Sequence, residues 1–242
     1  MCCRLGRTYR VWHDWVASAH ANGRQENTVT LLGQGRTCDV YDLGDDTVLR
    51  ARRDRRSIEH EALVMRHVHN HGFPCPRVHR AAGAEMVLDR VHGPTMTDDL
   101  MREPTDDRAR AAAIALAGLH DRLHTVPPLD GHDGRILHLD LHPDNVVVTG
   151  AGPVLIDWTN ADTGPAEVDI AMTWVILEPY ARTVLPVRWL CEAFLEAAGQ
   201  ALARRGLDRA AGRRLADPNL TDNERTAVRA LLDREHGADW NA

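Results

Sequence analysis

The chain has 242 residues, of which 43% are hydrophobic and 26% charged, and its formal net charge is −6. These values are ordinary for a globular protein of one domain or two small lobes, and the negative charge gives no reason to expect a nucleic-acid or anionic-membrane partner. No stretch has the length of a membrane-spanning helix, the start contains no apolar signal segment, and the five scattered cysteines form no C-x-x-C pair, so we expect a reduced, cytoplasmic protein.

The N-terminal part predicts a helix followed by a sheet. Residues 10–21 place tryptophan and aliphatic side chains at helical spacing, which is typical of an amphipathic helix. Residues 28–51 form strand-like runs separated by glycines, with a Gly-Asp-Asp turn at 44–46. Residues 57–69 then predict a second helix. Its expected apolar stripe consists of Ile58, Ala62, Met65 and Val68, with Glu59 and Glu61 off the stripe.

After residue 70 two more strands are expected, and past residue 95 the pattern becomes helical. Prolines within 73–78 end the preceding helix and lead into a strand, and residues 84–91 predict the fifth and last strand of the sheet. Further helices are expected over residues 106–125, 165–178, 187–205 and 223–233. The first of these should have an apolar face made of Ile114, Leu116, Leu119 and Leu123. A sheet followed by helices is the order of an α+β protein.

A polar loop and a β-hairpin carry most of the chemical information. Two apolar, β-branched runs flank the turn-forming residues 149–153 (TGAGP). Because a hairpin brings its two ends together, Asn145 before it and Asp157 after it should be neighbours, with Asp140 a few residues upstream. Carboxylate and amide oxygens are hard ligands of the kind that Mg²⁺ prefers. The sequence therefore predicts a magnesium site at the open end of this hairpin.

The spacing in this region resembles that of protein-kinase-like enzymes. His138-x-Asp140-x-x-x-x-Asn145 resembles the kinase catalytic loop, and Ile156-Asp157-Trp158 stands where that fold has its metal-binding Asp-Phe-Gly. HLDLHPDN, IDW and the later GPAEVDIAMTW (residues 164–174) together resemble the aminoglycoside phosphotransferase and choline kinase family of small-molecule kinases. The resemblance implies a bilobal protein-kinase-like fold of the α+β class.

This resemblance also implies how the two lobes are built. Residues 1–92 would form the nucleotide-binding lobe, with an antiparallel five-stranded sheet, one main helix and an extra N-terminal helix. Residues 93–242 would form a mostly helical catalytic and acceptor-binding lobe that contains the hairpin. The interlobe hinge would lie at residues 91–95, and adenine would bond backbone groups around Asp89 to Val91.

The roles of the catalytic residues follow from the same resemblance. Asp140 would orient the acceptor hydroxyl and take its proton, while Asn145 and Asp157 would hold Mg²⁺ beside ATP or GTP. Gly33 and Gly35 would form a loop whose backbone approaches the phosphates closely. A plain hairpin turn explains these two glycines equally well without that context.

The chain departs from the family at the residue that touches the phosphates. All 29 basic residues are arginine, so the strand lysine that the family uses is absent. The resemblance assigns its place to Arg50 and its helix partner to Glu61, with Glu59 as the alternative. Arginine presents a planar fork where lysine presents a compact ammonium, so the two need different surroundings.

Four histidines and Asp169, in or near the loop, have less specific patterns. The resemblance gives Asp169 a supporting role toward the backbone of the catalytic loop, and His138 and His142 are expected to support the loop or lie near the site. His120-Asp121-Arg122-Leu123-His124 resembles the H-E-x-x-H zinc helix with Asp in place of Glu. No downstream zinc ligand is placed by pattern, which disfavours zinc.

The predicted function is Mg²⁺-dependent transfer of the γ-phosphoryl group of ATP or GTP to a hydroxyl of a small molecule. An aminoglycoside-type antibiotic is one acceptor class, and choline-, homoserine- or sugar-like metabolites are the alternative. The C-terminal helices mix acidic residues with a similar number of arginines, so they show no acidic cradle for a polycation. The rival from another class is a nucleotide-binding module without turnover, which the missing lysine favours and the three retained site residues oppose.

Overall fold

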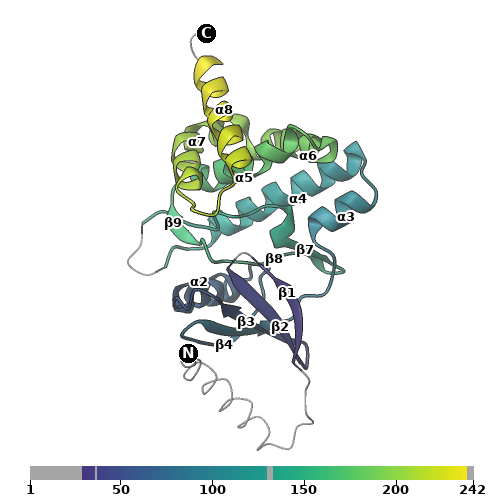
Figure 1. Cartoon of the computed structure of the whole chain (residues 1–242), viewed down its shortest axis with the longest axis vertical. Coiled ribbons are helices and arrows are strands. Elements are labelled where there is room, and N and C mark those ends of the chain that lie inside the picture. Colours follow the sequence, from purple (N-terminus) through teal and green to yellow (C-terminus); the bar gives the residue numbers. More distant parts are fainter. Residues whose placement is uncertain (1–28, 36, 130–132, 239–242) are drawn as a thin grey trace, which may run out of the picture.

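The computed structural model describes residues 29–35, 37–129 and 133–238. The helix predicted over residues 10–21 lies outside these ranges. A strand-rich part is followed along the chain by a helical part, and the β-hairpin of the second part lies between the two in space (Figure 1). Within the described residues, no helix combines the length and the apolar character needed to cross a membrane.

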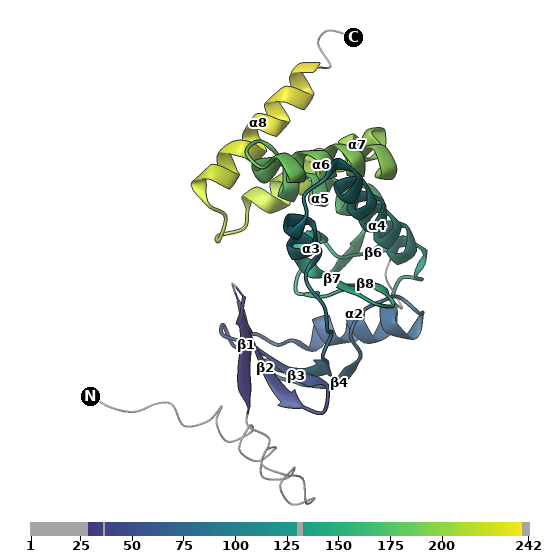
Figure 2. The ribbon, with the colours of Figure 1, turned by 90° about the vertical axis from the view of Figure 1, so that its right-hand side faces the viewer.

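The N-terminal part is the five-stranded antiparallel sheet that the sequence predicted. Its strand order is β1-β2-β3-β5-β4. The strands are β1 (Thr30–Gln34), β2 (Cys38–Gly44), β3 (Thr47–Arg52), β4 (Val78–Ala82) and β5 (Glu85–Asp89). Helix α2 (Glu59–Asn70) packs against this sheet, as the views in Figures 1 and 2 agree. Ile58, Ala62, Met65 and Val68 are buried, as the predicted stripe requires, but Glu61 is buried too.

The turn between β2 and β3 sets the register of the central strand. Asp45 and Asp46 both have positive φ angles, which is the backbone of a tight two-residue hairpin turn. Strand β3 consequently places Arg50 opposite Val40 on one neighbour and Met86 on the other. Arg50 is therefore a charged side chain in the middle of a central strand, and it is only 6% exposed.

The segment after β5 docks directly on the hairpin of the helical part. The N–H of Val148 donates to the carbonyl of Pro94 at 2.9 Å, and Thr95 forms a bridge with Val147. Gly93 has a φ of +148°, and a Cβ there would lie 2.2 Å from the Val148 carbonyl oxygen. Only glycine fits this approach, so the connection between the sheet and the hairpin depends on it.

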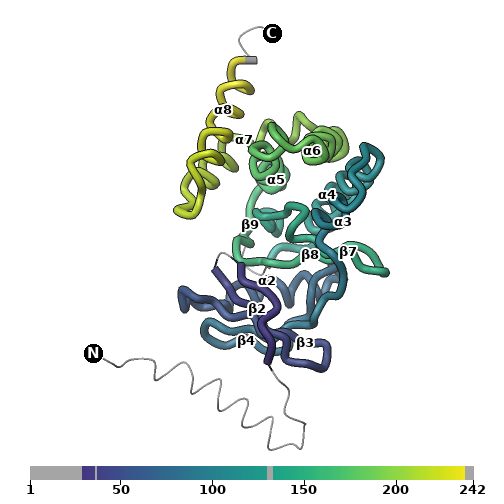
Figure 3. The backbone as a smooth tube through the Cα atoms, turned by 45° about the vertical axis from the view of Figure 1, so that its right-hand side comes forward, coloured from purple at the N-terminus to yellow at the C-terminus, as the bar shows by residue number. Residues whose placement is uncertain are grey.

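The rest of the chain is mostly helical, with two short two-stranded sheets. The helices are α3 (Met96–Arg102), α4 (Asp106–Thr125), α5 (Ala166–Ala181), α6 (Leu185–Ala198), α7 (Gln200–Leu215) and α8 (Asp222–Ala238). Strands β7 (Val146–Thr149) and β8 (Gly152–Leu155) form the predicted hairpin, and β6 (Arg135–Leu137) pairs with β9 (Asp162–Gly164). Figure 3 shows α8 as the outermost of these helices.

Three details of the helical part differ from the sequence prediction. The helix expected over residues 187–205 is two helices, because Gly199 has a φ of +91° and ends α6 before α7 begins. Ile114 is 59% exposed instead of lying on the apolar face of α4. Helix α3 was not predicted, since its seven residues carry too short a pattern to be read.

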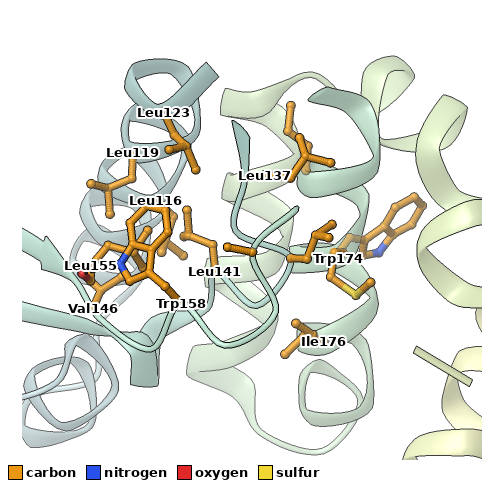
Figure 4. Packing of buried hydrophobic residues seen from close by; sticks show 14 of the residues in the cluster. Leu116, Leu119, Leu123, Leu137, Leu141, Val146, Leu155, Trp158, Trp174 and Ile176 are labelled. Atoms are coloured by element: carbon orange, nitrogen blue, oxygen red, sulfur yellow. Dashed lines mark hydrogen bonds between the residues drawn. The ribbon is translucent and has the colours of Figure 1, made fainter. Parts of the chain in front are cut away.

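The core is centred on α5, which is buried on nearly every side. It packs against α6, α7 and α8, as expected of a helix that is apolar all around. A second group of buried side chains lies where the hairpin meets α4. There Trp158, just after the hairpin, packs beside Leu116, Val146 and Leu155 (Figure 4). This packing holds the ends of the hairpin in place.

Candidate active site

The hairpin brings the predicted oxygen donors to one cavity. Val146 pairs with Leu155, and the N–H of Ile156 donates to the carbonyl of Asn145 at 2.9 Å, so the residues just outside the hairpin are adjacent. Asp140, Asn145 and Asp157 all line a cavity of about 560 Å³. Side chains that are 17 positions apart in sequence thus face one enclosed space.

Asn145 and Asp140 are held to each other inside the catalytic loop. A short 3-10 helix, η1 (Pro143–Asn145), ends the loop. The Nδ2 of Asn145 donates to the Asp140 carbonyl at 2.8 Å and lies 3.3 Å from the Asp140 carboxylate. The Nε2 of His142 accepts from the same amide at 3.2 Å. These contacts use the amide nitrogen of Asn145 and leave its amide oxygen for a cation.

Asp157 is held by Arg50, the residue to which the sequence resemblance assigned the lysine position. Arg50 donates to the Asp157 carboxylate at 2.6 Å and to the Thr159 hydroxyl at 2.7 Å, and Thr159 also donates to Asp157. Desolvation raises the pKa of Asp157, but Arg50 and Thr159 outweigh it, so the pKa lies below its ordinary value. Asp157 therefore stays ionised, and these contacts all use one of its two carboxylate oxygens.

Glu61 holds Arg50 from the other side. The two form a short, buried ion pair, with side chains 7% and 4% exposed. Burial raises the pKa of the Glu61 carboxyl, and Arg50 opposes that rise. The structure thus brings Arg50 to Glu61 as the sequence predicted, whereas the alternative, Glu59, is exposed.

His138 supports the loop from within the core. Its Nε2 donates to the Ile156 carbonyl at 3.1 Å, and its ring meets Trp158 edge to face with centroids 4.8 Å apart. Burial lowers the pKa of this imidazole, since the charged form would lose its hydration. His138 is therefore a neutral contact between the loop and the exit of the hairpin.

Asp169 holds the backbone of the catalytic loop. It is fully buried at the start of α5, and its Oδ1 accepts from the N–H of Leu139 at 2.6 Å. Leu139 has a φ of +60°, a conformation that few side chains adopt without such support. Desolvation raises the pKa of Asp169, but His120 and His124 outweigh it and hold the pKa far below its usual range.

The two histidines of the zinc-like pattern are engaged in the same network. His124 lies 3.0 Å and His120 3.3 Å from Oδ2 of Asp169. These three side chains could hold a metal ion by the closeness of their donor atoms. They also have a structural use, because His120 contacts Thr173, whose hydroxyl donates to the Leu141 carbonyl at 2.6 Å. The network thus ties α4 and α5 to the loop, and it needs no ion to do so.

The residues predicted to bind nucleotide do not all lie together. Gly35 lines the cavity and its N–H closes a turn onto the Cys38 carbonyl, whereas Gly33 lies outside the cavity lining. Asp89 and Val91 are also outside the lining. The N–H of Asp89 is already engaged with the Arg77 carbonyl.

Several cavity residues were not found from the sequence. Thr159 follows the Ile-Asp-Trp motif by one position and contacts both Arg50 and Asp157. Ile176, Leu177 and Tyr180 of α5 also line the cavity. Their apolar type is that of core residues, so no local pattern separates them from the rest of a buried helix.

Comparison with known proteins assigns this chain to a family. A model of the "Phosphotransferase enzyme family" matches residues 28–135 and 123–218. Thiamine kinases of Salmonella paratyphi B and Salmonella newport are each 49% identical over 39 residues. That stretch is 16% of this chain and 14% of each thiamine kinase, so the match covers a small part of those enzymes.

Solved structures resemble the chain over most of its length. The streptomycin–ATP ternary complex of APH(2")-IIa has a TM-score of 0.60 at 11% identity, over 88% of this chain and 90% of that one. The amicoumacin kinase hAmiN, solved with AMP-PNP, Ca²⁺ and amicoumacin, has a TM-score of 0.59 at 12% identity over 93% and 94%. A choline/ethanolamine kinase family protein from Mesorhizobium loti has a TM-score of 0.55 at 17% identity over 93% and 92%. At these identities the likeness shows the fold, which agrees with the predicted kinase-like α+β class.

Proposed function

The chain belongs to the phosphotransferase enzyme family of small-molecule kinases, and from that membership we propose that it moves the γ-phosphoryl group of ATP or GTP to a hydroxyl of a small molecule. The observation that supports this most strongly is that Asp140, Asn145 and Asp157 line one cavity. In phosphoryl transfer a protein contributes mainly position and charge neutralisation, and a base, an amide and a carboxylate in one cavity are suited to that task.

Asp140 is the catalytic residue of this proposal. Its carboxylate is held by Asn145 and lies 3.6 Å from His142, so it is oriented while one side faces the cavity. In that position it accepts a hydrogen bond from the acceptor hydroxyl and takes the proton as the phosphoryl group is transferred. Asp140 thereby orients the nucleophile toward the phosphate.

Asn145 and Asp157 are the proposed ligands of Mg²⁺. The donor set fits, because both present oxygen atoms to the cavity after their other contacts are counted. When bound, the cation would neutralise charge on the triphosphate. Asn145 and Asp157 would in turn fix where the phosphates lie relative to Asp140.

Arg50 and the glycine turn form the phosphate side of the proposed site. Arg50 is directed at Asp157 by Glu61, and Gly35 lies at the cavity wall. Gly33 would contribute backbone flexibility and not a direct contact. Adenine would bind near Asp89 to Val91, with Val91 as the contacting residue, since the N–H groups of Asp89 and Arg90 already donate to the carbonyls of Arg77 and Asp46.

The lobe boundary, the compartment and the biological setting belong to the same proposal. Residues 1–92 form the nucleotide lobe and residues 93–242 the catalytic lobe. A reducing cytoplasm suits the buried thiols of Cys38, Cys75 and Cys191. The similar structures include kinases of antibiotics and of a choline/ethanolamine type, so antibiotic resistance is one setting and metabolism the other.

The proposal is tested by replacing the catalytic carboxylate. Asp140→Ala should lower ADP formation with Mg²⁺-ATP by at least about 10²-fold, because a positioned base contributes about that much. Nucleotide affinity should stay within about twofold of the wild type, since Asp140 contacts the acceptor and not the phosphates. Asp208→Ala, which removes a carboxylate that is 74% exposed and lies outside the cavity lining, is the matched control. Unchanged turnover in Asp140→Ala would instead favour a nucleotide-binding module.

A further inference from the structure

The cavity has a second wall that the phosphoryl-transfer residues do not use. We call this wall the acceptor wall, and it consists of Met101, Ile176, Leu177, Tyr180, Val184 and Val187. These side chains come from α3, from the C-terminal half of α5 and from the start of α6, whereas Gly35 and Asp157 of the same lining come from the sheet side and from the hairpin exit. All six are apolar or aromatic.

Parts of this wall are accessible within the described structure. Tyr180 is 45% exposed and Met101 is 38% exposed, although both are large and mainly apolar. Ile176 and Leu177 are 5% and 4% exposed and form the base beneath them. A large apolar surface that is left open beside a reactive centre indicates that a ligand covers it.

Two charged side chains near the acceptor wall are paired within the protein. Arg214, which also lines the cavity, lies 3.1 Å from Glu224 and 3.9 Å from Asp217. Glu178 on α5 is buried and bound to Arg234 at 2.8 Å. The carboxylates in the lining are Asp140, Asp144 and Asp157, all from the catalytic loop and the exit of the hairpin.

This distribution of charge limits what the cavity can bind. On the acceptor wall a polycation would lose hydration against apolar groups, and the carboxylates of the lining lie elsewhere, on the loop and at the hairpin exit, where Asp140 and Asp157 already have roles in the proposed site. A molecule with an apolar body loses little by the same transfer and gains from covering the wall. The exposed ring of Tyr180 can also stack on a flat ring or attract a single positive charge.

We infer that the acceptor is an alcohol with an aromatic body that carries at most one positive charge, and that Tyr180 is the residue that selects it. The hydroxyl lies at Asp140 and the aromatic body lies on the acceptor wall. This inference rests on the proposed kinase function and narrows its acceptor to one chemical class. It disfavours polycationic aminoglycosides.

The experiment compares acceptors of different charge and shape at saturating Mg²⁺-ATP. ADP formation is measured with 2-phenylethanol as a neutral aromatic alcohol, thiamine as a singly cationic aromatic alcohol, choline as a small cation and kanamycin as a polycation. We expect at least one aromatic alcohol to have a kcat/KM at least ~10-fold above that of choline and kanamycin. A higher value for choline or kanamycin overturns the inference, and so does stimulation by none of the aromatic alcohols while basal ATP hydrolysis persists. Absence of basal hydrolysis as well as of all stimulation is a failure of the proposed function itself.

Variants of Tyr180 test whether this residue selects the acceptor. Tyr180→Ala should raise the KM for the preferred aromatic alcohol ~10-fold with little change in kcat, while Tyr180→Phe should keep the KM within ~2-fold because the ring remains. Leu185→Ala removes another exposed apolar side chain, 49% exposed and outside the cavity lining, and should change neither value. An equal effect of Tyr180→Ala on choline and on the aromatic alcohol would contradict selection by the ring.

Discussion

Arg50 is the residue at which this chain departs most from what its family resemblance implies. Its guanidinium contacts Glu61, Asp157 and Thr159 at once, which a lysine ammonium at the end of an unbranched chain cannot reproduce with the same planar geometry. Arg50 is therefore fixed by three partners at its position in the central strand. Glu61 and Asp157 both contact the Arg50 guanidinium, and burial strengthens the electrostatic attraction between these groups.

Replacing Arg50 should destabilise the fold. Arg50→Met leaves Glu61 buried without its partner, and breaking a buried pair in this way typically costs about 3–5 kcal/mol. Arg50→Lys keeps the charge and should cost less. Urea unfolding followed by circular dichroism measures the change.

Arg56→Met is the matched control for this substitution. Arg56 is 81% exposed and 3.8 Å from Asp54, so its removal should change the free energy of unfolding by less than about 0.5 kcal/mol. An Arg50→Met protein as stable as the Arg56→Met protein would show that the buried pair does not hold the strand in place.

Asp157 carries the metal dependence that we propose. Asp157→Ala should make nucleotide affinity the same with and without Mg²⁺, because it removes a charged oxygen ligand. Calorimetric titration of ATP with and without Mg²⁺ measures this. Asp162→Ala, which removes a half-exposed carboxylate five positions later, should retain the full Mg²⁺ effect. Persistent Mg²⁺ dependence in Asp157→Ala would reject that ligand.

At the scale of elements, the helical part depends on how closely α5 and α7 approach. Gly206 in α7 faces the start of α5, and a Cβ there would lie 2.0 Å from the carbonyl oxygen of Glu167. No flexible side chain can move aside, since the obstacle is backbone. This close approach also holds the start of α5, where Asp169 reaches the catalytic loop.

Replacement of two glycines in the same helix by alanine should change the free energy of unfolding in opposite directions. Gly206→Ala should lower the free energy of unfolding by about 1–3 kcal/mol, because the helices must separate. Gly212→Ala meets nothing within 4 Å and should raise stability by up to about 1 kcal/mol through better helix propensity. Thermal unfolding of both variants tests the pair. Stabilisation by Gly206→Ala would show that α5 and α7 are not in close contact there.

At the scale of the whole molecule, one buried carboxylate links the catalytic loop to two helices and should set part of the acid sensitivity. Because the pKa of Asp169 in the folded protein is far below its ordinary value of 3.8, its stabilising contribution is complete well above that value and is lost progressively as the pH falls below it toward the folded pKa. Between pH 5 and pH 3 this one group should reduce the free energy of unfolding by about 1 kcal/mol.

The measurement is urea unfolding of the wild type and Asp169→Asn across that pH range. The variant should be less stable at neutral pH but should lose about 1 kcal/mol less on acidification. Asp233→Asn, which changes an exposed carboxylate, should follow the wild-type curve. Parallel curves for the wild type and Asp169→Asn would contradict a depressed pKa.

Much of the fold and of the candidate site could be read along the chain because the information is local. The alternation of 28–51, the periodicity of α4 and the turn formers at 149–153 each lie within one short segment. Asp140, Asn145 and Asp157 were recognisable for the same reason, since their spacing spans a single loop and hairpin. Gly199 was missed because a helix break by one glycine resembles an interior glycine until its φ angle is known.

Other features depend on how distant segments pack. Arg50 and Asp157 are 107 positions apart, and their contact exists because the sheet docks on the hairpin through Gly93 and Pro94. The burial of Glu61 and the acceptor wall around Tyr180 likewise arise from several elements at once. The family and the three residues proposed for the site are therefore evident from local spacing. The partners of Arg50 and the character of the acceptor wall come from long-range packing, because contacts between remote segments leave no periodic pattern in either segment.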